Sequence, residues 1–345
     1  MSDITLSQAE DLTTGRPTGR LLEVDDLHVE FHTRDGVAKV INGVTYHVDA
    51  GETLAVLGES GSGKSVTAQT IMGILDIPPG RITSGQIRFN GIDMLTMPEE
   101  SRRQIRGAGI AMVFQDALSA LNPVFTVGFQ IGEQFRVRQG LSRKDAKRRA
   151  IEMLDQVKMP NAKQRVDEYP HQFSGGMRQR VMIAMSLALD PQVLIADEPT
   201  TALDVTVQAQ IMDLLADLQR ERQMGMILIT HDLGVVADVA DRIAVMYAGR
   251  IVEQARVHEL YANPAHPYTI GLLESIPRID EKGQQLRTIK GLPPNLMRIP
   301  SGCPFHPRCP MAQPEICVPK VPPLLQLSPT RASACHFAEE LVNRV

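Results

Sequence analysis

One run of the chain combines glycines, a lysine and a hydroxyl side chain in the spacing that binds nucleotide phosphates. This phosphate loop reads GESGSGKS at residues 58–65 and fits the pattern G-x-x-x-x-G-K-[ST]. Its glycines let backbone N–H groups converge on phosphate oxygens, and a helix expected from about Val66 adds positive potential. Lys64 can reach the β- and γ-phosphates, and the Ser65 hydroxyl can bind Mg²⁺. The residues expected to contact the nucleotide are Gly58, Ser60, Gly61, Gly63, Lys64, Ser65 and Val66.

Two adjacent carboxylates supply the other half of a hydrolytic site. An apolar run at residues 193–196 is followed directly by Asp197 and Glu198. Asp197 suits the shell of Mg²⁺, directly or through water. Glu198 can orient or deprotonate a water that attacks the γ-phosphate. His231 follows a third apolar run and could hydrogen-bond the same phosphate, so Glu198, His231 and Lys64 are the predicted catalytic residues.

The phosphate loop, the two carboxylates and His231 can act together only if a β-sheet brings them to the same edge. The runs at residues 53–57, 193–196 and 226–229 are nearly all apolar, as expected of strands buried on both faces of a parallel sheet. Ligands bind at the carboxyl ends of such strands, where each run is followed by polar residues. The fold class is therefore α/β. Earlier runs alternate and predict an antiparallel, half-exposed layer; they lie at 21–24, 28–31, 38–41 and 44–48.

The stretch from about residue 98 to residue 172 is predicted to be a helical insertion. Within it, SRKDAKRRAIEMLDQVKM places apolar side chains at helical spacing, with lysines and arginines on the other face. A solvated helix face explains this basic run better than a nucleic-acid patch does. The apolar positions are Ala146, Ala150, Met153, Leu154 and Val157.

Composition bounds the class of protein. The 345 residues allow two or three folded units. The formal net charge of −4 argues against non-specific binding to the phosphate backbone of nucleic acids. No apolar run approaches the roughly 20 residues needed to cross a bilayer. Residues 1–20 lack apolar periodicity and the pattern of a signal peptide, so we expect a flexible tail and a cytoplasmic protein.

The four cysteines form a cluster near the C-terminus, with the spacing C-x5-C-x7-C-x17-C. Cys303, Cys309, Cys317 and Cys335 lie in a tail that begins near residue 282 and is rich in proline. Eleven of the 23 prolines fall between residues 293 and 329, so the tail is expected to form neither long helices nor central strands. In a chain without an export signal, clustered cysteines favour metal binding over disulfides.

Three states of this cluster are open from the residues themselves. Four thiolates can enclose a [4Fe–4S] cluster or a tetrahedral Zn²⁺. At a zinc site, His306 or His336 could replace a cysteine as a ligand. The cysteines could also be reduced and unligated. The segment lacks the C-x2-C pair common in structural zinc sites. A bound metal would stabilise a segment without a core of its own, so a structural role is favoured over redox sensing.

The run HQFSGGMRQR at residues 171–180 resembles the signature loop of ATP-binding cassette (ABC) proteins, with Phe173 in the usual leucine position. A serine and two glycines open an apolar helix there, with Ser174 expected as its N-cap, which makes a second anion site. Other family elements follow the family's order. Gln115 resembles the Q-loop glutamine, residues 201–204 the D-loop and His231 the switch histidine, while Phe31 lies where the family stacks an aromatic ring on adenine.

The resemblance implies an ABC-type nucleotide-binding domain over residues 21–260, with a sheet core around the phosphate loop, an antiparallel β subdomain and a helical subdomain at about 98–172. ATP and Mg²⁺ are the implied ligands, and Gln115 joins Ser65 and Asp197 as a Mg²⁺ ligand. In this family two cassettes close head to tail. The side chains and backbone expected to complete the nucleotide site across that dimer are Ser174, Gly175, Gly176 and Asp204.

The extension at residues 261–345 looks like that of ATP-binding subunits of oligopeptide and dipeptide importers. The motifs are NPAHPYT at 263–269, GLPP at 291–294 and GCPFHPRC at 302–309. Relatives of this type also import nickel chelates and glutathione. The implied partners are a second ATPase subunit, expected to be a paralogue, two permease subunits and an extracytoplasmic peptide-binding protein. This resemblance also favours the [4Fe–4S] cluster and a peripheral position on the cytoplasmic face of the membrane.

Two other functions fit the sequence less well than peptide import does. A soluble ABC ATPase of DNA repair, chromosome organisation or translation usually has coiled-coil insertions, fused cassettes or strongly basic surfaces. This chain has one cassette of modest length and a slightly acidic total charge. A regulatory cassette that binds ATP without hydrolysis is disfavoured by the presence of Glu198 and His231.

Overall fold

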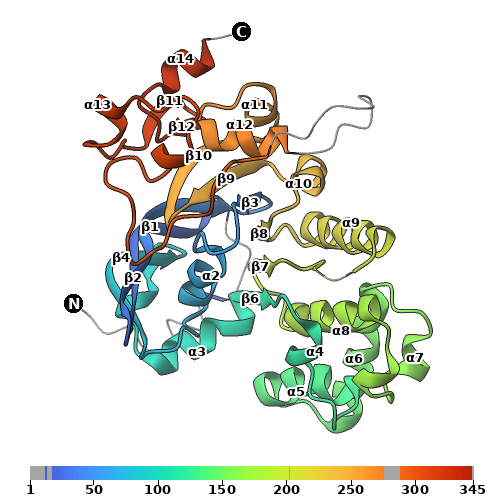
Figure 1. Cartoon of the computed structure of the whole chain (residues 1–345). Helices are drawn as coiled ribbons and strands as arrows, with labels where there is room; N and C mark the ends of the chain where they lie inside the picture. The colour runs from blue at the N-terminus through green and yellow to red at the C-terminus, as the bar shows by residue number, and fades with distance from the viewer. Residues whose placement is uncertain (1–11, 14–17, 202, 276–287, 344–345) are drawn as a thin grey trace. The chain divides into compact units, whose positions relative to one another are not determined.

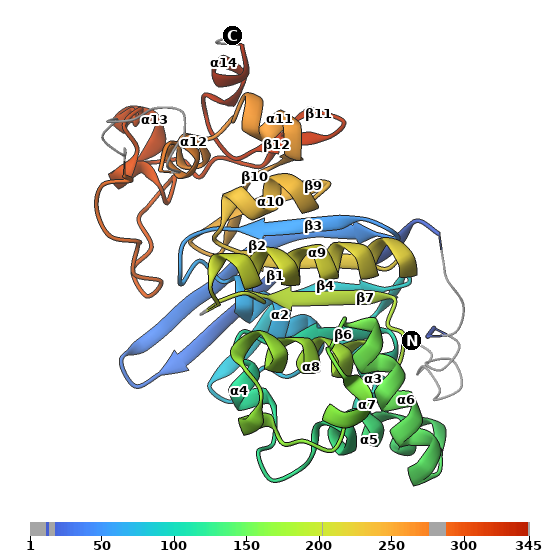
Figure 2. The same ribbon diagram turned by 90° about the vertical axis from the view of Figure 1, so that its right-hand side faces the viewer.

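The computed structural model describes residues 12–13, 18–201, 203–275 and 288–343. Most of the predicted N-terminal tail, the D-loop residue Ala202 and the expected start of the proline-rich tail near residue 282 lie outside these ranges. The chain divides into two compact units. Figures 1 and 2 label their helices and strands. The first unit takes in residues 1–21, 48–52 and 96–228, and the second takes in 22–47, 53–95 and 229–345.

The first unit combines a group of packed helices with a short parallel sheet. Helices α5, α6 and α8 contact one another, and the strand order is β8-β7-β6. The helices are α3 (Glu99–Ala108), α4 (Ala117–Ala120), α5 (Val127–Gln139), α6 (Arg143–Gln156), α7 (Ala162–Arg165), η2 (Pro170–Gln172), α8 (Gly175–Leu187) and α9 (Val205–Arg222). The strands are β6 (Ile110–Val113), β7 (Val193–Asp197) and β8 (Gly225–Thr230), whose last two residues belong to the second unit.

Helix α6 confirms the helical spacing predicted from the sequence. All five predicted apolar positions are buried, from Ala146 to Val157. Ser142 caps the helix, because its hydroxyl accepts a hydrogen bond from the backbone N–H of Asp145 at 3.2 Å. The basic face is solvated, and Lys147 pairs there with Asp167 at 2.7 Å.

The stretch at about residues 98–172, predicted to be a helical insertion, also contains one short strand, β6. All four residues of β6 are buried, and the strand pairs in parallel with β7. A run of four apolar residues is too short to show a helix or strand period, so only its distant partner strand decides its structure.

The second unit contains an antiparallel sheet and one side of a mixed sheet. The strand orders are β2-β1-β4-β5 and β11-β12-β10-β9-β3. The strands are β1 (Arg20–Thr33), β2 (Gly36–Asp49), β3 (Thr53–Leu57), β4 (Gly80–Phe89), β5 (Ile92–Asp93), β9 (Arg242–Tyr247), β10 (Arg250–Arg256), β11 (Leu325–Ser328) and β12 (Arg331–Ser333). The helices are α2 (Lys64–Met72), η1 (Met94–Thr96), α10 (Leu233–Val239), α11 (Val257–Ala262), α12 (Pro267–Glu274), η3 (His306–Arg308), α13 (Pro314–Cys317) and α14 (Ala338–Val342). Residues 20–21 of β1, 48–49 of β2 and 96 of η1 belong to the first unit.

The four alternating runs near the N-terminus form two long strands rather than four short ones. In β1, the pairing with β4 shifts register between Asp25 and His28, and Asp26 has a φ of 44°. Such a bulge accommodates extra residues without ending a strand. The polar residues at the bulge interrupt the alternation, which is why the sequence pattern indicated a break.

The expectation that the proline-rich tail forms no central strand is wrong for three residues. Strand β12 lies between β11 and β10, with Ala332 opposite Gln254. It begins just after Pro329, the last proline of the chain, so each of its residues keeps a backbone N–H for the sheet. The tail is thereby joined to the sheet of the second unit.

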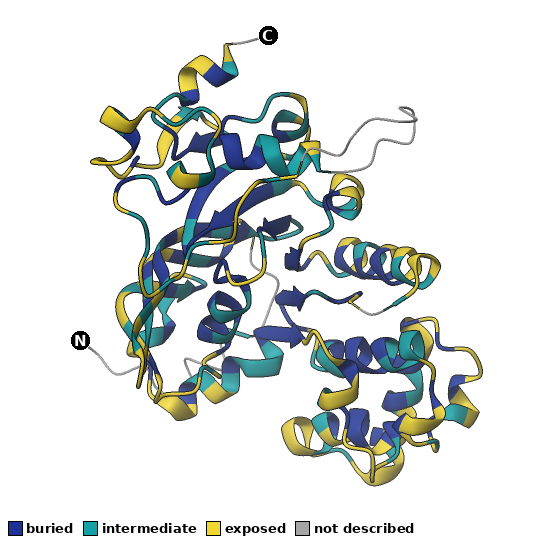
Figure 3. Cartoon of the chain, in the orientation of Figure 1, coloured by how far each residue is buried: buried dark blue, intermediate teal, exposed yellow. Residues whose placement is uncertain are grey.

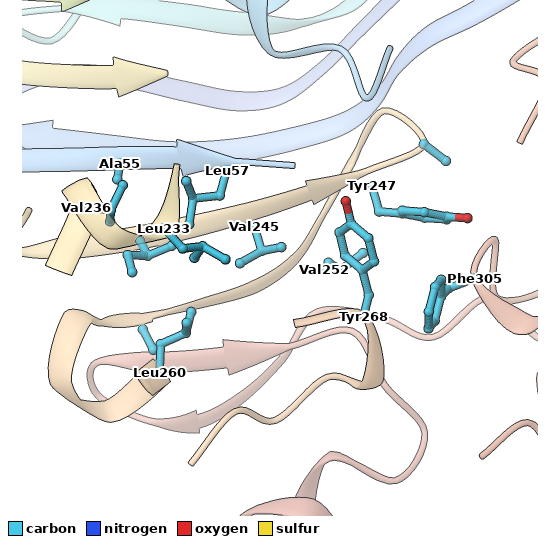
Figure 4. Close-up of a cluster of buried hydrophobic side chains, with 13 residues drawn as sticks. Ala55, Leu57, Leu233, Val236, Val245, Tyr247, Val252, Leu260, Tyr268 and Phe305 are labelled. Atoms are coloured by element: carbon cyan, nitrogen blue, oxygen red, sulfur yellow. The ribbon is translucent and has the colours of Figure 1, made fainter. Parts of the chain in front are cut away.

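The core of the second unit lies between the β3–β9–β10 part of the sheet and the helices that follow it. Leu57, Val245 and Val252 from the strands pack with Leu260 and Tyr268 from α11 and α12 (Figure 4). Strands β3 and β9 are buried along almost their whole length (Figure 3). Among the described residues, no helix has the length and apolar character needed to span a bilayer.

Candidate nucleotide site

The phosphate loop joins the end of β3 to the start of α2 in the second unit. Helix α2 begins at Lys64, two residues before the start predicted at Val66. Gly58 has a φ of 153°, and a Cβ atom there would lie 2.2 Å from the carbonyl oxygen of Met246 in β9. A larger residue would push the loop away from the sheet, so glycine is required where the chain leaves β3.

The N-terminus of α2 has no side-chain cap. Gly63 occupies the cap position with a φ of 107°, and no side chain accepts a hydrogen bond there. The first turn also contains no acidic residue. Backbone N–H groups at a helix start attract anions, and no helix-capping carboxylate competes for them here.

The ammonium group of Lys64 lies against the phosphate loop itself. The residue is 5% exposed, and its Nζ donates to the carbonyl oxygens of Gly58 at 2.7 Å and Glu59 at 3.0 Å. Ser65 is half-buried in the first turn of the same helix. A positive group and a hydroxyl thus lie at the uncapped start of α2, which is the arrangement that phosphate binding requires.

In the first unit, the carboxylate of Glu198 is held by two neutral donors. The side-chain amide of Gln115 and the hydroxyl of Thr201 each donate to its Oε2 at 2.9 Å. Gln115 and Glu198 follow the neighbouring parallel strands β6 and β7, in which Val113 is opposite Ala196. Each residue lies two positions beyond that pair, so the register of the strands brings the two side chains together.

The backbone at Glu198 is left-handed, with a φ of 45°, which is uncommon for a residue other than glycine. Asp197, the last residue of β7, is 5% exposed, whereas Glu198 is half-buried. Of the two adjacent carboxylates, Glu198 is thus the more accessible, and its oxygen is fixed by the donors described above. A fixed and accessible carboxylate can act as a base or orient a water.

The signature residues form the capped start of α8. The exposed Ser174 accepts a hydrogen bond from the N–H of Met177 at 3.4 Å, which confirms the predicted cap, and Gly175 and Gly176 form the first turn. Phe173 is buried, with the guanidinium group of Arg165 5.7 Å from its ring centre. The buried position of Phe173 suits an apolar side chain, such as the leucine that is usual there.

Three other predicted site residues lie at element ends. Asp204 caps α9, because its carboxylate accepts from the N–H of Val207 at 2.9 Å. His231 is exposed and follows β8. Phe31 is half-buried near the end of β1, opposite Gly80 in β4.

The predicted residues divide between the two units. The phosphate loop, Phe31 and His231 belong to the second unit. The first unit contains the remaining predicted nucleotide-site residues, which are Gln115, Ser174, Gly175, Gly176, Asp197, Glu198 and Asp204.

The four cysteines belong to one cysteine segment, residues 303–335, in the second unit. All four thiols are free, and those of Cys303, Cys309 and Cys317 all lie within electrostatic reach of Cys335. Burial raises the pKa of Cys303 to about 11 and that of Cys335 to about 12, while backbone N–H groups that bond the sulfurs oppose the shift. One such bond runs from the N–H of Phe337 to the Sγ of Cys335 at 3.4 Å.

The four thiols lie in one segment, but their side chains are not placed as the ligands of a metal site. Among the described residues, no three histidine, cysteine, aspartate or glutamate side chains form a group that could hold a metal ion. His306 Nδ1 lies 2.9 Å from the carbonyl oxygen of Cys303, and His336 Nε2 lies 3.0 Å from that of Lys320. A carbonyl oxygen only accepts, so each of these nitrogens donates a hydrogen bond to the backbone.

The structure adds residues that sequence reasoning did not assign to the nucleotide site. Arg308 pairs with Glu59 of the phosphate loop, and the hydroxyl of Tyr268 accepts from the N–H of Glu59. Tyr268 and Arg308 lie inside the C-terminal motifs at residues 263–269 and 302–309, whose sequence indicates a family resemblance and no contact with the loop. Thr201 lies in the D-loop motif, and its contact with Glu198 was not expected.

Two family models match the chain. The model described as ABC transporter matches residues 41–201, and that described as oligopeptide/dipeptide transporter, C-terminal region, matches residues 252–317.

Curated proteins show similarity over most of the chain. It is 52% identical to the oligopeptide transport ATP-binding protein OppD of Salmonella typhimurium, across 95% of this chain and 97% of that protein. It is 50% identical to the dipeptide transport ATP-binding protein DppD of Bacillus subtilis, across 84% of this chain and 87% of that protein.

Solved structures of cassettes share the fold. A dimeric ATP-binding cassette in a post-hydrolysis state, bound to ADP and Pi, matches with a TM-score of 0.61 and 26% identity, over 69% of this chain and 99% of that one. The protein cbiO1 from Clostridium perfringens, part of an ABC transporter complex, matches with a TM-score of 0.61 and 30% identity, over 71% and 91%.

Proposed function

The chain belongs to the ATP-binding subunits of the ABC transporters, in the oligopeptide and dipeptide group, and we propose that it powers the import of peptides through a membrane complex. It is a transport-coupled ATPase. The observation that carries the proposal is the similarity to OppD along nearly the full length of both chains. This similarity includes the C-terminal region, which the oligopeptide/dipeptide family model also matches.

For the phosphates we propose binding by the loop at the start of α2. The backbone N–H groups from Gly58 to Val66 surround the β-phosphate, and the ammonium of Lys64 exchanges its bonds to loop carbonyls for bonds to the β- and γ-phosphates. Ser65, Gln115 and Asp197 would hold Mg²⁺, which supplies positive charge to the phosphate oxygens when bound. The uncapped, acid-free start of α2 supports this assignment.

For hydrolysis we propose that Glu198 orients the attacking water and takes its proton. Its carboxylate is held by Gln115 and Thr201, and both donors are neutral. The charge of the carboxylate is therefore not cancelled by either neighbour, and its direction is fixed. His231 donates a hydrogen bond to the γ-phosphate in this scheme, and Phe31 stacks on the adenine ring.

We propose that a second ATPase subunit, a paralogue of this chain, completes each nucleotide site. Ser174, Gly175, Gly176 and Asp204 would then face the nucleotide bound by the partner's phosphate loop. The exposed Ser174 at the start of α8 supports this role, because a helix start attracts a γ-phosphate. ATP favours the closed pair, and hydrolysis removes that preference.

The remaining partners are proposed from the named relatives. Two permease subunits form the path through the membrane, an extracytoplasmic binding protein delivers peptide, and this chain is peripheral on the cytoplasmic face. OppD and DppD are named for oligopeptide and dipeptide transport, respectively. We assign peptides as the cargo class and make no assignment among individual peptides.

We also propose that the cysteine segment of the C-terminal extension holds a [4Fe–4S] cluster with a structural role. The ligands would be Cys303, Cys309, Cys317 and Cys335. Support comes from the gathering of four free thiols and from backbone N–H groups that bond to sulfur, a setting that stabilises cluster sulfurs. The thiols are not arranged as a metal site, so binding requires local adjustment of the segment.

Iron analysis and visible absorption of anaerobically purified protein test this cluster. We expect about four irons per chain and a broad absorption band that disappears in Cys317→Ser. A colourless protein, whether it carries zinc or no metal at all, would rule out the iron–sulfur assignment and leave the ATPase assignment intact.

The transport function is tested by the ATPase activity of the complex reconstituted with its permeases. We expect hydrolysis to rise when peptide-loaded binding protein is added, and the unloaded binding protein is the control. Stimulation by DNA or ribosomes, with no response to peptide-loaded binding protein, would contradict peptide import.

A further inference from the structure

An ion pair that uses both terminal guanidinium nitrogens of Arg308 connects the phosphate loop to the cysteine segment. Nη1 of Arg308 lies 2.6 Å from Oε2 of Glu59, and Nη2 lies 2.9 Å from Oε1. Glu59 is the second residue of the phosphate loop, and Arg308 lies between Cys303 and Cys309. Paired bonds of this kind fix the direction of both groups as well as their distance.

The ion pair is largely buried and lies beside the ring of Tyr247. The side chain of Arg308 is 6% exposed and that of Glu59 is 26% exposed. The guanidinium group lies 5.8 Å from the ring centre of Tyr247, whose hydroxyl accepts from Nη1 at 3.4 Å. Removing charges from water is costly, so a pair this buried is stable only when its geometry is well matched.

A second contact holds the backbone of the same loop residue. The N–H of Glu59 donates to the hydroxyl oxygen of Tyr268 at 2.9 Å. Tyr268 packs against Tyr247 and against Phe305 of the cysteine segment, with ring centres 4.7 and 5.3 Å apart (Figure 4). The side chain and the backbone of Glu59 are thus both held by the C-terminal half of the second unit.

The turn that carries Arg308 is itself fixed within the cysteine segment. The N–H of Cys303 donates to the carbonyl oxygen of Cys317 at 2.8 Å, and that of Arg308 donates to Phe305 at 3.0 Å. Gly302 has a φ of 65°, and a Cβ atom there would lie 2.2 Å from the carbonyl oxygen of Cys317. Close backbone packing therefore defines where the guanidinium group points.

We propose that Arg308 is a positioning residue for nucleotide binding, which acts by fixing Glu59 and by neutralising its charge. This inference rests on the proposed role of the phosphate loop in binding ATP. The carbonyl oxygen of Glu59 already accepts from Lys64, so displacement of Glu59 moves the surroundings of the phosphate-binding ammonium. An unpaired carboxylate in the loop would also repel the triphosphate.

The test measures MgATP affinity with a fluorescent ATP analogue, together with KM and kcat of the assembled transporter. Arg308→Ala should weaken affinity and raise KM by about tenfold, while kcat at saturating ATP changes by less than about twofold. Arg308→Lys keeps the charge but loses the paired geometry, so it should recover part of the affinity. Arg298→Ala is the matched control, because Arg298 is an exposed arginine of the same extension.

A compensating variant separates positioning from simple misfolding. In the Arg308→Ala background, Glu59→Gln removes the unpaired charge and should restore affinity to within about twofold of Glu59→Gln alone. Wild-type affinity in Arg308→Ala would overturn the proposal. Equal weakness in Arg308→Ala and the double variant, with Glu59→Gln normal, would also overturn it and assign Arg308 a purely structural role.

Lys64→Ala separates this inference from the function on which it rests. If Lys64→Ala both bound and hydrolysed MgATP as the wild type does, the phosphate loop would not be the nucleotide site, whatever Arg308→Ala does. If Lys64→Ala lost binding while Arg308→Ala did not, the loop assignment would stand and the role of Arg308 would fall.

Discussion

Side chains from elsewhere in the chain form hydrogen bonds with the phosphate loop and with the Glu198 carboxylate. The residues that make these bonds come from different parts of the chain in the two cases. Glu59 of the loop is bonded by Tyr268 and Arg308, which follow it by 209 and 249 residues. Glu198 is bonded by Thr201, three residues later, and by Gln115, 83 residues earlier. These contacts to Glu59 therefore come from the C-terminal extension, whereas these two contacts to Glu198 come from the first unit.

The two regions also differ in the charge of their supports. A guanidinium group holds Glu59, so the negative charge of that carboxylate is neutralised in place. An amide and a hydroxyl bond to Oε2 of Glu198, and neither of these two neutral donors neutralises the carboxylate. The first arrangement suits a loop that must accept an anion, and the second suits a base.

The largest effect is expected from Glu198→Gln, which tests the proposed role of this carboxylate as a base. Removing a general base should lower kcat by about a hundredfold to ten-thousandfold, because the water loses its proton acceptor. Nucleotide affinity should remain, and the ATP-bound pair of cassettes should accumulate. Steady-state hydrolysis and sedimentation of the dimer measure both; turnover at the wild-type rate would contradict the assignment.

Lys64→Ala should act on the loop and have the next largest effect. Loss of a charge-assisted hydrogen bond to phosphate is expected to weaken MgATP binding by about tenfold to a hundredfold. Equilibrium titration with a fluorescent ATP analogue measures this. An unchanged dissociation constant, with kcat reduced instead, would move the role of Lys64 from binding to the chemical step.

Ser174→Arg tests the start of α8, which neither of the compared regions contains. The added bulk at the proposed dimer face should lower the ATPase activity of the transporter on the order of tenfold, in line with an overpacking cost of about 1–3 kcal/mol. ATP binding to the separate subunit should be unaffected. Normal transporter ATPase activity would weaken the proposal of a composite site.

The smallest and most discriminating effects are expected from a matched pair that removes one neutral hydrogen bond in each region. Tyr268→Phe should raise KM for ATP by about two- to tenfold and leave kcat unchanged, whereas Thr201→Val should lower kcat by a similar factor and leave affinity unchanged. Stopped-flow binding and steady-state kinetics separate the two. The same pattern in both variants would remove the distinction between the regions.

The sequence predicts those parts of the site whose support is local. The positions of Lys64 and Glu198 at a helix start and a strand end are confirmed, as is the Ser174 cap, because short motifs contain the glycines, carboxylates and caps concerned. Their catalytic and binding roles stay predictions. Helix α6 was predicted correctly because its apolar period extends over several turns.

Other features depend on partners far along the chain and were not predictable in this way. Strand β6 is only four residues long and is defined by its pairing with β7. Strand β12 lies between two other strands although a proline-rich run precedes it. The pairing of Arg308 with Glu59 requires the extension to be folded onto the second unit, and no local pattern at either residue indicates it.

The most direct test of the central claim is the uptake of labelled peptide into proteoliposomes that contain the complete transporter, with binding protein and peptide on one side and MgATP on the other. The account predicts ATP-dependent accumulation by the wild type and its near-complete loss in Glu198→Gln. Accumulation by Glu198→Gln at the wild-type rate, or by the wild type without ATP, would contradict the claim that this chain couples hydrolysis to peptide import.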